Sequence, residues 1–247
     1  MRRFPACMIV ALAILIGDGA LIAFMIFLFA GPPGFLHMGL EQGEVLWFDA
    51  GLSLLFFIQH SGMVRNSFRR WITMFITKEY DRAIYAILSG AFLLAMIVCW
   101  QEVPHSFQAP DGTFRWSLRA VYWLSMLGFV WGVLSLKLFD PCGVLPIIAR
   151  LREKEPKQMP FAARGAYLWV RHPLYFFFIL MIWSYPALQA DRLLFNGLWT
   201  LWIVIGAFLE ERDLVDEFGE TYREYQSQVP MFIPWRLKSK RQFAVDS

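Results

Sequence analysis

The chain has 247 residues, of which 57% are hydrophobic and only 17% are charged, and its formal net charge at pH 7 is +3. This composition excludes an ordinary water-soluble domain, in which apolar residues are fewer and charged residues more numerous. The small positive charge lies in loops and in the carboxyl-terminal tail, which suits a membrane surface, so nucleic-acid binding is excluded as well.

Six apolar segments follow one another along the chain, at residues 7–30, 45–64, 84–100, 120–136, 174–190 and 193–209. Each of the last four segments has 17 residues. A helix of that length rises about 26 Å, which is close to the minimum needed to cross a hydrocarbon core. We therefore predict an all-α, polytopic membrane protein of about six transmembrane helices. Six spans with short loops use most of the chain, so we expect residues 1–247 to form a single membrane domain.

The loop charges divide unequally between the two sides of this predicted topology. Of the 23 lysines and arginines, only Arg115, Arg119 and Arg192 fall on one side, and the others fall on the opposite side. Lysine and arginine concentrate in cytoplasmic loops. We therefore expect both termini in the cytoplasm and, for a bacterial protein, a location in the inner membrane.

Only Asp191 and Arg192 separate the last two apolar segments, which predicts a tight antiparallel hairpin with a cytoplasmic open end. Because its two arms have the same length, the start of one arm, 171–175, should lie level with the end of the other, 210–213. These stretches read Arg-His-Pro-Leu-Tyr and Glu-Glu-Arg-Asp. Two polar clusters that are far apart in sequence are thus expected to become neighbours.

The paired clusters offer charges of both signs to a ligand. Pro173 suits a first helical turn, whose free amides attract an anion. Glu210 and Glu211 offer the opposite charge, and S-adenosylmethionine is a ligand with both kinds of group. The alternative is that Arg171 and Arg212 simply pair with the two glutamates, as charges at helix ends commonly do.

Other polar residues lie within the apolar segments. Asp18 and Asp49 should face the bundle interior or water, and a structural hydrogen bond to a neighbouring helix is favoured over a substrate contact. His60 ends the second segment on the predicted cytoplasmic side, where it could reach the same site as His172. The four histidines are far apart in the sequence and fall on opposite sides of the membrane, so we expect no metal site.

A set of motifs between residues 165 and 235 resembles a known family. The set comprises Arg171-His172-Pro173-Leu174-Tyr175, an apolar hairpin, Glu210-Glu211-Arg212-Asp213-Leu214, Phe218-Gly219, Tyr222, Tyr225 and Val229-Pro230-Met231-Phe232-Ile233-Pro234. With it the chain resembles the membrane methyltransferases typified by isoprenylcysteine carboxyl methyltransferase and phospholipid N-methyltransferases. Within that group it is most similar to bacterial methanethiol S-methyltransferases, which share a Gln-His-Ser like Gln59-His60-Ser61, a basic loop like Phe68-Arg69-Arg70-Trp71 and a Phe-Asp like Phe139-Asp140.

The resemblance implies that S-adenosylmethionine is the methyl donor and that residues 165–235 form the donor-binding region. His172, Pro173 and Tyr175, with Arg171 beside them, would line the nucleotide and amino-acid moieties. Glu210 and Glu211 would bind polar groups of the donor. The resemblance also implies that the helix after Glu211 forms a cytoplasmic cap over the site.

One position departs from the family pattern. The family's arginine-histidine-proline motif usually continues with tyrosine, one residue and then glycine, whereas Tyr175 is followed by Phe176 and Phe177. Glycine permits the close approach of a ligand or a helix. The bulky ring of Phe177 takes the place of this glycine, so the geometry of donor binding, and activity itself, depend on how the ring is accommodated.

The resulting hypothesis is an integral-membrane enzyme that moves a methyl group from S-adenosylmethionine to a thiol, with methanethiol as the leading acceptor and dimethyl sulfide as its product. His60 or His172 would take the thiol proton. A second hypothesis replaces the acceptor by an isoprenylcysteine carboxylate or a lipid head group that enters laterally. A third is a non-catalytic membrane scaffold or transport factor. The sequence leaves the oligomeric state open.

Overall fold

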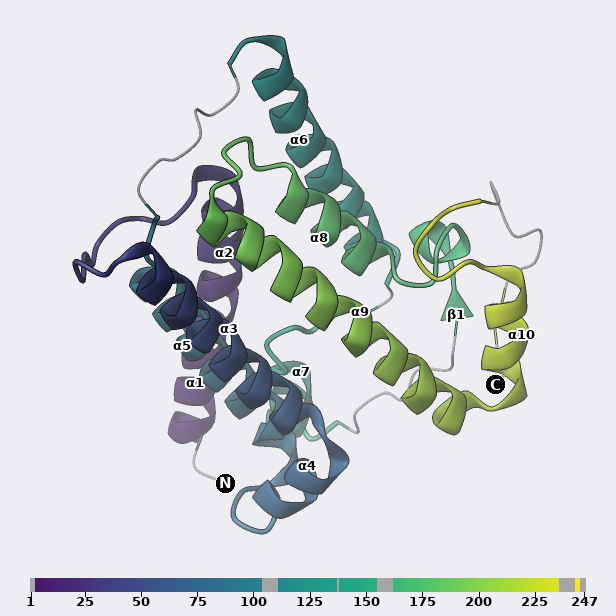
Figure 1. The fold of residues 1–247 in the computed structure, drawn as a ribbon. Coiled ribbons are helices and arrows are strands. Elements are labelled where there is room, and N and C mark those ends of the chain that lie inside the picture. The colour runs from purple at the N-terminus through teal and green to yellow at the C-terminus, as the bar shows by residue number, and fades with distance from the viewer. Residues whose placement is uncertain (1–2, 104–110, 137, 155–161, 236–242, 245–247) are drawn as a thin grey trace. The chain divides into compact units, whose positions relative to one another are not determined.

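The computed structural model describes residues 3–103, 111–136, 138–154, 162–235 and 243–244, and these residues are mainly helical (Figure 1). The elements in chain order are α1 (Arg3–Leu12), the π-helix η1 (Ala13–Asp18), α2 (Gly19–Ala30), α3 (Gln42–Val64), α4 (Asn66–Ile72), η2 (Lys78–Tyr80), α5 (Asp81–Cys99), α6 (Thr113–Leu134), α7 (Leu145–Leu151), β1 (Ala162–Ala163), η3 (Gly165–Leu168), α8 (Pro173–Trp183), α9 (Ala190–Phe218), α10 (Glu220–Gln228) and β2 (Phe243–Ala244). The two short strands pair with each other in antiparallel orientation.

The chain divides into two compact units. The amino-terminal unit comprises Met1–Phe107, Asp140–Lys157 and Leu188–Phe195, and the carboxyl-terminal unit comprises Gln108–Phe139, Gln158–Ala187 and Asn196–Ser247. Most of the predicted donor-binding region, 165–235, belongs to the carboxyl-terminal unit. The single membrane domain stays a prediction.

The prediction of an all-α, multi-pass membrane protein is confirmed. Within the described part of the chain, four helical stretches are long and apolar enough to cross a membrane: Phe4–Ala30, Lys78–Cys99, Thr113–Leu134 and Ala190–Phe218. The helix α8 has 11 residues and rises about 17 Å, less than the thickness of a hydrocarbon core. The total of six spans stays a prediction.

The predicted two-residue connection between the last two segments is wrong. Helix α8 ends at Trp183 and α9 begins at Ala190, so Asp191 and Arg192 lie inside α9. Pro186 explains the early end of α8, because proline removes a backbone donor and disfavours helical geometry in the residue before it. The break was not predicted because it lies within the continuous apolar segment 174–190.

The predicted end of the last segment, at residue 209, is also wrong. Helix α9 continues to Phe218 and ends there, before Gly219, whose φ of 56° lies in the left-handed region that glycine adopts without strain. Glu210 and Glu211 therefore stand within a helix and not at its end. The fall in hydropathy after residue 209 shows where the apolar part of α9 ends, and the helix continues beyond it with polar residues.

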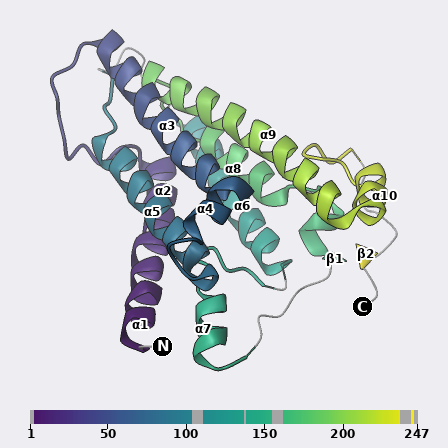
Figure 2. The ribbon, with the colours of Figure 1, turned by 90° about the horizontal axis from the view of Figure 1, so that it is seen from below.

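In the amino-terminal unit, small side chains allow the first helical stretch to approach α5 closely. Ala6, Ala13 and Ala83 are completely buried. A Cβ added to Gly90 would lie 2.7 Å from the carbonyl oxygen of Ile16, so the two backbones are nearly in contact there. Small residues at helix contacts are a common way to pack helices in membranes. Helix α3 also lies along α5 (Figure 2).

Asp49 and Asp18, in the second and first predicted spans, both make hydrogen bonds within the protein, and their partners lie in the connections between helices. Asp49 in α3 is fully buried and accepts a hydrogen bond of 3.1 Å from the backbone amide of Gln101, just beyond α5. Asp18 accepts a bond of 3.0 Å from the Cys142 thiol. Burial, assisted by Asp18, raises the pKa of Cys142 to about 12, so the thiol stays protonated at neutral pH.

In the carboxyl-terminal unit, two glycines of α6 receive two large side chains of α8. A Cβ added to Gly128 would overlap the ring of Phe177, and one added to Gly132 would lie 2.7 Å from Cδ2 of Leu174. Phe177 is buried in this contact. The ring that departs from the family pattern therefore packs against glycine on the neighbouring helix, which keeps a close contact between a large and a small residue.

We predict that Gly128→Ala destabilises the protein by about 1–3 kcal/mol, because the Phe177 ring must move to admit one methyl group. Thermal unfolding of the protein in detergent measures the effect. Gly197→Ala is the matched control, since a Cβ at Gly197 meets nothing within 4 Å. Adding Phe177→Leu should recover part of the loss, and equal stability of the two alanine variants would contradict this packing.

Candidate functional site

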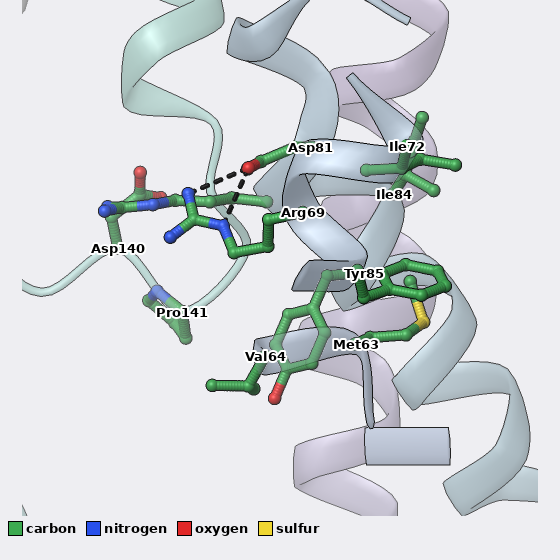
Figure 3. Close-up of a pocket in the computed structure, with 11 residues that line it drawn as sticks. Met63, Val64, Arg69, Ile72, Asp81, Ile84, Tyr85, Asp140 and Pro141 are labelled. Carbon is green, nitrogen blue, oxygen red and sulfur yellow. Dashed lines mark hydrogen bonds and ion pairs between the residues drawn. The ribbon is translucent and has the colours of Figure 1, made fainter. Parts of the chain in front are cut away.

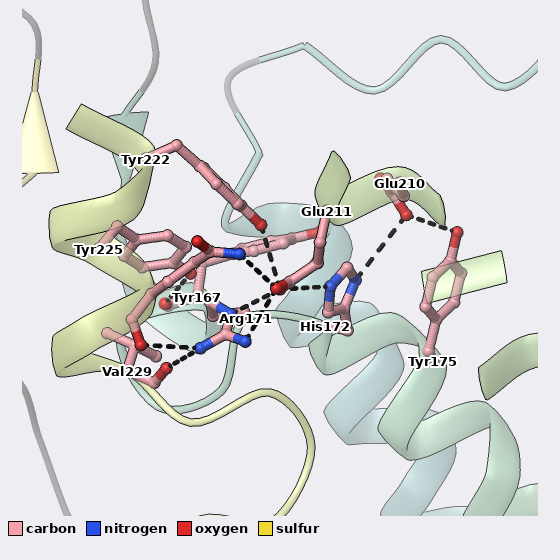
Figure 4. Close-up of polar contacts among 10 residues, drawn as sticks. Tyr167, Arg171, His172, Tyr175, Glu210, Glu211, Tyr222, Tyr225 and Val229 are labelled. Carbon is pink, nitrogen blue, oxygen red and sulfur yellow. Dashed lines mark hydrogen bonds and ion pairs between the residues drawn. The ribbon is translucent and has the colours of Figure 1, made fainter. Parts of the chain in front are cut away.

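A buried carboxylate, Glu211 on α9, lies at the centre of a polar cluster in the carboxyl-terminal unit (Figure 4). Nε and Nη2 of Arg171 donate to its two oxygens over 2.6 and 2.9 Å. Nε2 of His172 lies 3.0 Å from Oε1. The Tyr222 hydroxyl donates to Oε1 over 3.3 Å and the Gln226 amide to Oε2 over 2.6 Å. Both oxygens are thus occupied by protein groups.

Arg171 connects this carboxylate to the end of α10 and to the segment that follows it. Its Nη1 donates to the carbonyl oxygens of Gln226 and Val229 over 3.0 and 2.5 Å. The backbone amide of Arg171 donates to Pro230 over 2.8 Å, and that of His172 donates to Met231 over 3.2 Å. The motif before α8 and the motif after α10 therefore form one assembly.

The alternative, that Arg171 and Arg212 simply pair with the two glutamates, holds for Arg171 and not for Arg212. Arg171 forms a bidentate pair with Glu211, and its side chain is largely buried. Arg212 is exposed and makes no ion pair or hydrogen bond among the described side chains. Most donors of Arg171 and both oxygens of Glu211 are used internally, so this pair holds the local fold together.

Two tyrosines of α10 complete the buried side of the cluster. Burial, with the charge of Glu211 nearby, raises the pKa of Tyr222 above its usual range. Burial likewise raises the pKa of Tyr225, whose hydroxyl donates to the Tyr167 carbonyl over 2.5 Å. Both hydroxyls therefore remain protonated donors at neutral pH. Gln226, which the sequence reading missed, is one helical turn beyond Tyr222, and that spacing was the available signal.

The opposite side of the cluster is open. Glu210 has a side chain that is 46% exposed and accepts one hydrogen bond of 2.8 Å, from the Tyr175 hydroxyl. Nδ1 of His172 lies 3.8 Å from Oε2 of Glu210. The rings of His172 and Tyr175 stack at 5.4 Å with an interplanar angle of 3°. The buried Pro173 begins α8, and no side chain caps its amino-terminal turn.

The structure thus brings together the predicted residues Arg171, His172, Pro173, Tyr175, Glu210 and Glu211. His60 lies in the amino-terminal unit, where the Tyr85 hydroxyl is 2.8 Å from its Nε2 and the Phe56 ring is 5.2 Å away. Its part in the same site stays a prediction. Among the described residues no group of three or more histidines, cysteines or acidic residues could hold a metal ion.

Helix α8 runs antiparallel to the middle part of α9 (Figure 1). Trp183 donates to Thr200 over 3.0 Å at one end, and Tyr175 contacts Glu210 near the other. The long apolar helices define a polytopic membrane protein, and this polar cluster is its candidate site, at one end of a helix pair. Known proteins are similar to the chain in sequence over about three quarters of its length.

A methanethiol S-methyltransferase of Pseudomonas sp. (strain GM41(2012)) is 38% identical over 200 residues, which cover 78% of this chain and 74% of that protein. One of Mycobacterium tuberculosis (strain ATCC 25618 / H37Rv) is 32% identical over 196 residues, covering 78% and 80%. Nurim of Pan troglodytes is 28% identical over 185 residues, covering 68% of each chain. No family model and no solved structure matches the chain.

The chain belongs to the family of methanethiol S-methyltransferases. It is accordingly a membrane methyltransferase and requires a methyl donor. The resemblance seen in the sequence is confirmed, and the enzyme hypotheses are favoured over a non-catalytic scaffold.

We predict that Glu211→Ala lowers the stability of the detergent-solubilised protein by about 3 kcal/mol, because Arg171 is left buried without its partner. Thermal unfolding without any donor present is the measurement. Glu217→Gln, an exposed carboxylate on the same helix, is the control and should leave the unfolding temperature unchanged. Equal stability of Glu211→Ala and the unmodified protein would show that the cluster is not structural.

Proposed function

We propose that this enzyme transfers a methyl group from S-adenosylmethionine to a small thiol, with methanethiol as the acceptor and dimethyl sulfide as the product. The observation that carries the proposal is the division of the polar cluster into an internally satisfied side, with Arg171 and Glu211, and a partly exposed side, with Glu210 and Tyr175. Nδ1 of the buried His172 lies 3.8 Å from Glu210 on that side. The names of the relatives support a thiol acceptor.

The open side suits the chemistry of the donor. The Glu210 carboxylate is partly exposed and has acceptor capacity left for the cationic groups of S-adenosylmethionine. The Tyr175 ring offers an aromatic surface to a purine. The uncapped amino-terminal turn of α8, beginning at Pro173, favours a carboxylate. We assign these three residues to donor binding.

Arg171 and Glu211 then act as positioning residues. Their side chains are engaged with each other and with α10 and its following segment, so a ligand would have to displace existing hydrogen bonds. We assign to them the task of holding His172 and the start of α8 in place. This refines the expectation that both glutamates contact the donor.

S-adenosylmethionine supplies an activated methyl group on a sulfonium, which a thiolate displaces with departure of a neutral thioether. The protein must therefore deprotonate the thiol, exclude water and align the sulfur. An ionised Glu211 can only accept, so Nε2 of His172 carries the proton in that contact and Nδ1 has the free lone pair. The thiol proton passes to Nδ1, and nearby Glu210 stabilises the imidazolium.

The loop charges support a cytoplasmic location for this site, with both termini on the same side. We assign the protein to a bacterial inner membrane, because the methanethiol S-methyltransferases that it resembles come from bacteria.

Calorimetric titration of the purified protein with S-adenosylmethionine tests donor binding. We expect saturable binding that Glu210→Gln weakens about tenfold, because a charge-assisted contact to the donor is lost. Glu217→Gln should bind like the unmodified protein. Absence of binding by folded protein would refute the proposed donor, and unchanged affinity of Glu210→Gln would misplace its site.

Turnover measurements test the acceptor and the base. Methanethiol should be methylated, whereas an isoprenylcysteine carboxylate should not. We predict that His172→Gln lowers kcat about 10²–10⁴-fold with little change in donor affinity, because a general base is lost. His37→Gln, which alters an exposed loop histidine, is the control. Full activity of His172→Gln would exclude this base and turn attention to His60.

A further inference from the structure

A pocket of about 200 Å³ lies within the amino-terminal unit, far along the chain from the residues of the donor site (Figure 3). It is bounded by the end of α3, by α4, by the start of α5 and by Asp140 and Pro141. Apolar side chains such as Met63, Ile72 and Ile84 form part of its wall, and charged side chains form the rest. This mixture suits a ligand with one charged end and an apolar remainder.

Both acidic residues of the pocket have their oxygens engaged by other groups of the protein. Asp81 is buried and pairs with Arg69, whose Nη2 lies 2.8 Å from Oδ2 (Figure 3). The two oxygens of Asp140 accept the backbone amides of Val144 and Leu145, each over 2.9 Å, at the start of α7. The charge of Asp81 is balanced by Arg69, whereas Asp140 keeps its negative charge and has both oxygens directed at backbone amides.

Arg82 supplies a positive charge that has no ionic partner among the described residues. It is exposed and lines the pocket, and no described side chain forms an ion pair or hydrogen bond with it. The exposed Arg65 and Arg70, on either side of the first turn of α4, likewise lack an ionic partner among the described residues. Four arginines, at positions 65, 69, 70 and 82, lie in or beside the pocket with two aspartates, Asp81 and Asp140, so the charge around it is net positive and attracts anions.

An apolar surface adjoins these charges. The rings of Phe68 and Trp71, and those of Trp71 and Phe75, are 5.4 Å apart. Trp71 is 50% exposed, and Met74 and Phe75 are each 70% exposed. Aromatic residues beside arginines on a short amphipathic stretch are typical of segments that lie in a membrane interface. The pocket is thus bordered by a surface suited to lipid.

We infer that this pocket binds the phosphate head group of an anionic phospholipid, with Arg82 as its principal contact and the apolar surface of Trp71, Met74 and Phe75 beside the acyl chains. Basic pockets at the membrane interface bind acidic head groups because charge-assisted hydrogen bonds from a guanidinium replace the hydration that the phosphate gives up. The inference rests only on the amino-terminal unit and is independent of the proposed methyl transfer.

Native mass spectrometry of the purified protein in neutral detergent tests the inference. The probes are phosphatidylglycerol and phosphatidylcholine, titrated separately. We expect retained phosphatidylglycerol, about tenfold weaker binding in Arg82→Gln and no comparable binding of phosphatidylcholine. Glutamine keeps the Cβ of Arg82, against which the backbone at Gly143 packs. Equal retention of both lipids would overturn the inference.

Two further variants distinguish the pocket from general surface charge. Arg152→Gln removes an exposed arginine of the same unit that does not line the pocket, and it should leave the affinity unchanged. Ile84→Trp, with folding checked by thermal unfolding, should block binding by filling the cavity. If Arg82→Gln and Arg152→Gln weaken binding equally, or folded Ile84→Trp binds normally, the lipid is held by diffuse charge and the inference fails.

Discussion

The carboxylate of Glu211 is the constraint on which the carboxyl-terminal unit depends. Removing a charge from water costs several kcal/mol unless other groups replace the lost hydration. Here Arg171, His172, Tyr222 and Gln226 make that replacement, and they come from the turn before α8 and from α10. Arg171 lies 40 positions before Glu211 and Gln226 lies 15 positions after it, so one acidic residue holds together segments that are distant in the sequence.

The same contacts explain how neighbouring glutamates can have different tasks. Glu211 faces the interior and is saturated, whereas Glu210, one position earlier and about 100° away around the helix, is partly exposed beside Tyr175. A saturated carboxylate orients the imidazole of His172, and an unsaturated one is free for a cation. The proposed division between positioning and donor binding follows from this difference in surroundings.

Packing between α6 and α8 shows how a departure from a family pattern can be accommodated. Phe177 would obstruct a neighbouring helix if that helix presented a large side chain, but it meets Gly128, and Leu174 meets Gly132. In lipid the hydrophobic effect contributes little to helix association, so such close contacts contribute much of the attraction. The large residue lies on α8 and the small one on α6.

The sequence by itself determined the membrane character, the helical class and the residues that would meet, because hydropathy and charge are properties of short segments. The proximity of Arg171 and His172 to Glu211 was predicted even though the intervening loop was misjudged, since Pro186 had been read as part of an apolar run. Only the tertiary structure decided which glutamate is buried, that Gln226 joins the cluster, and that Phe177 meets a glycine. These outcomes depend on which helix faces lie together, and that is settled by packing between segments distant in the sequence.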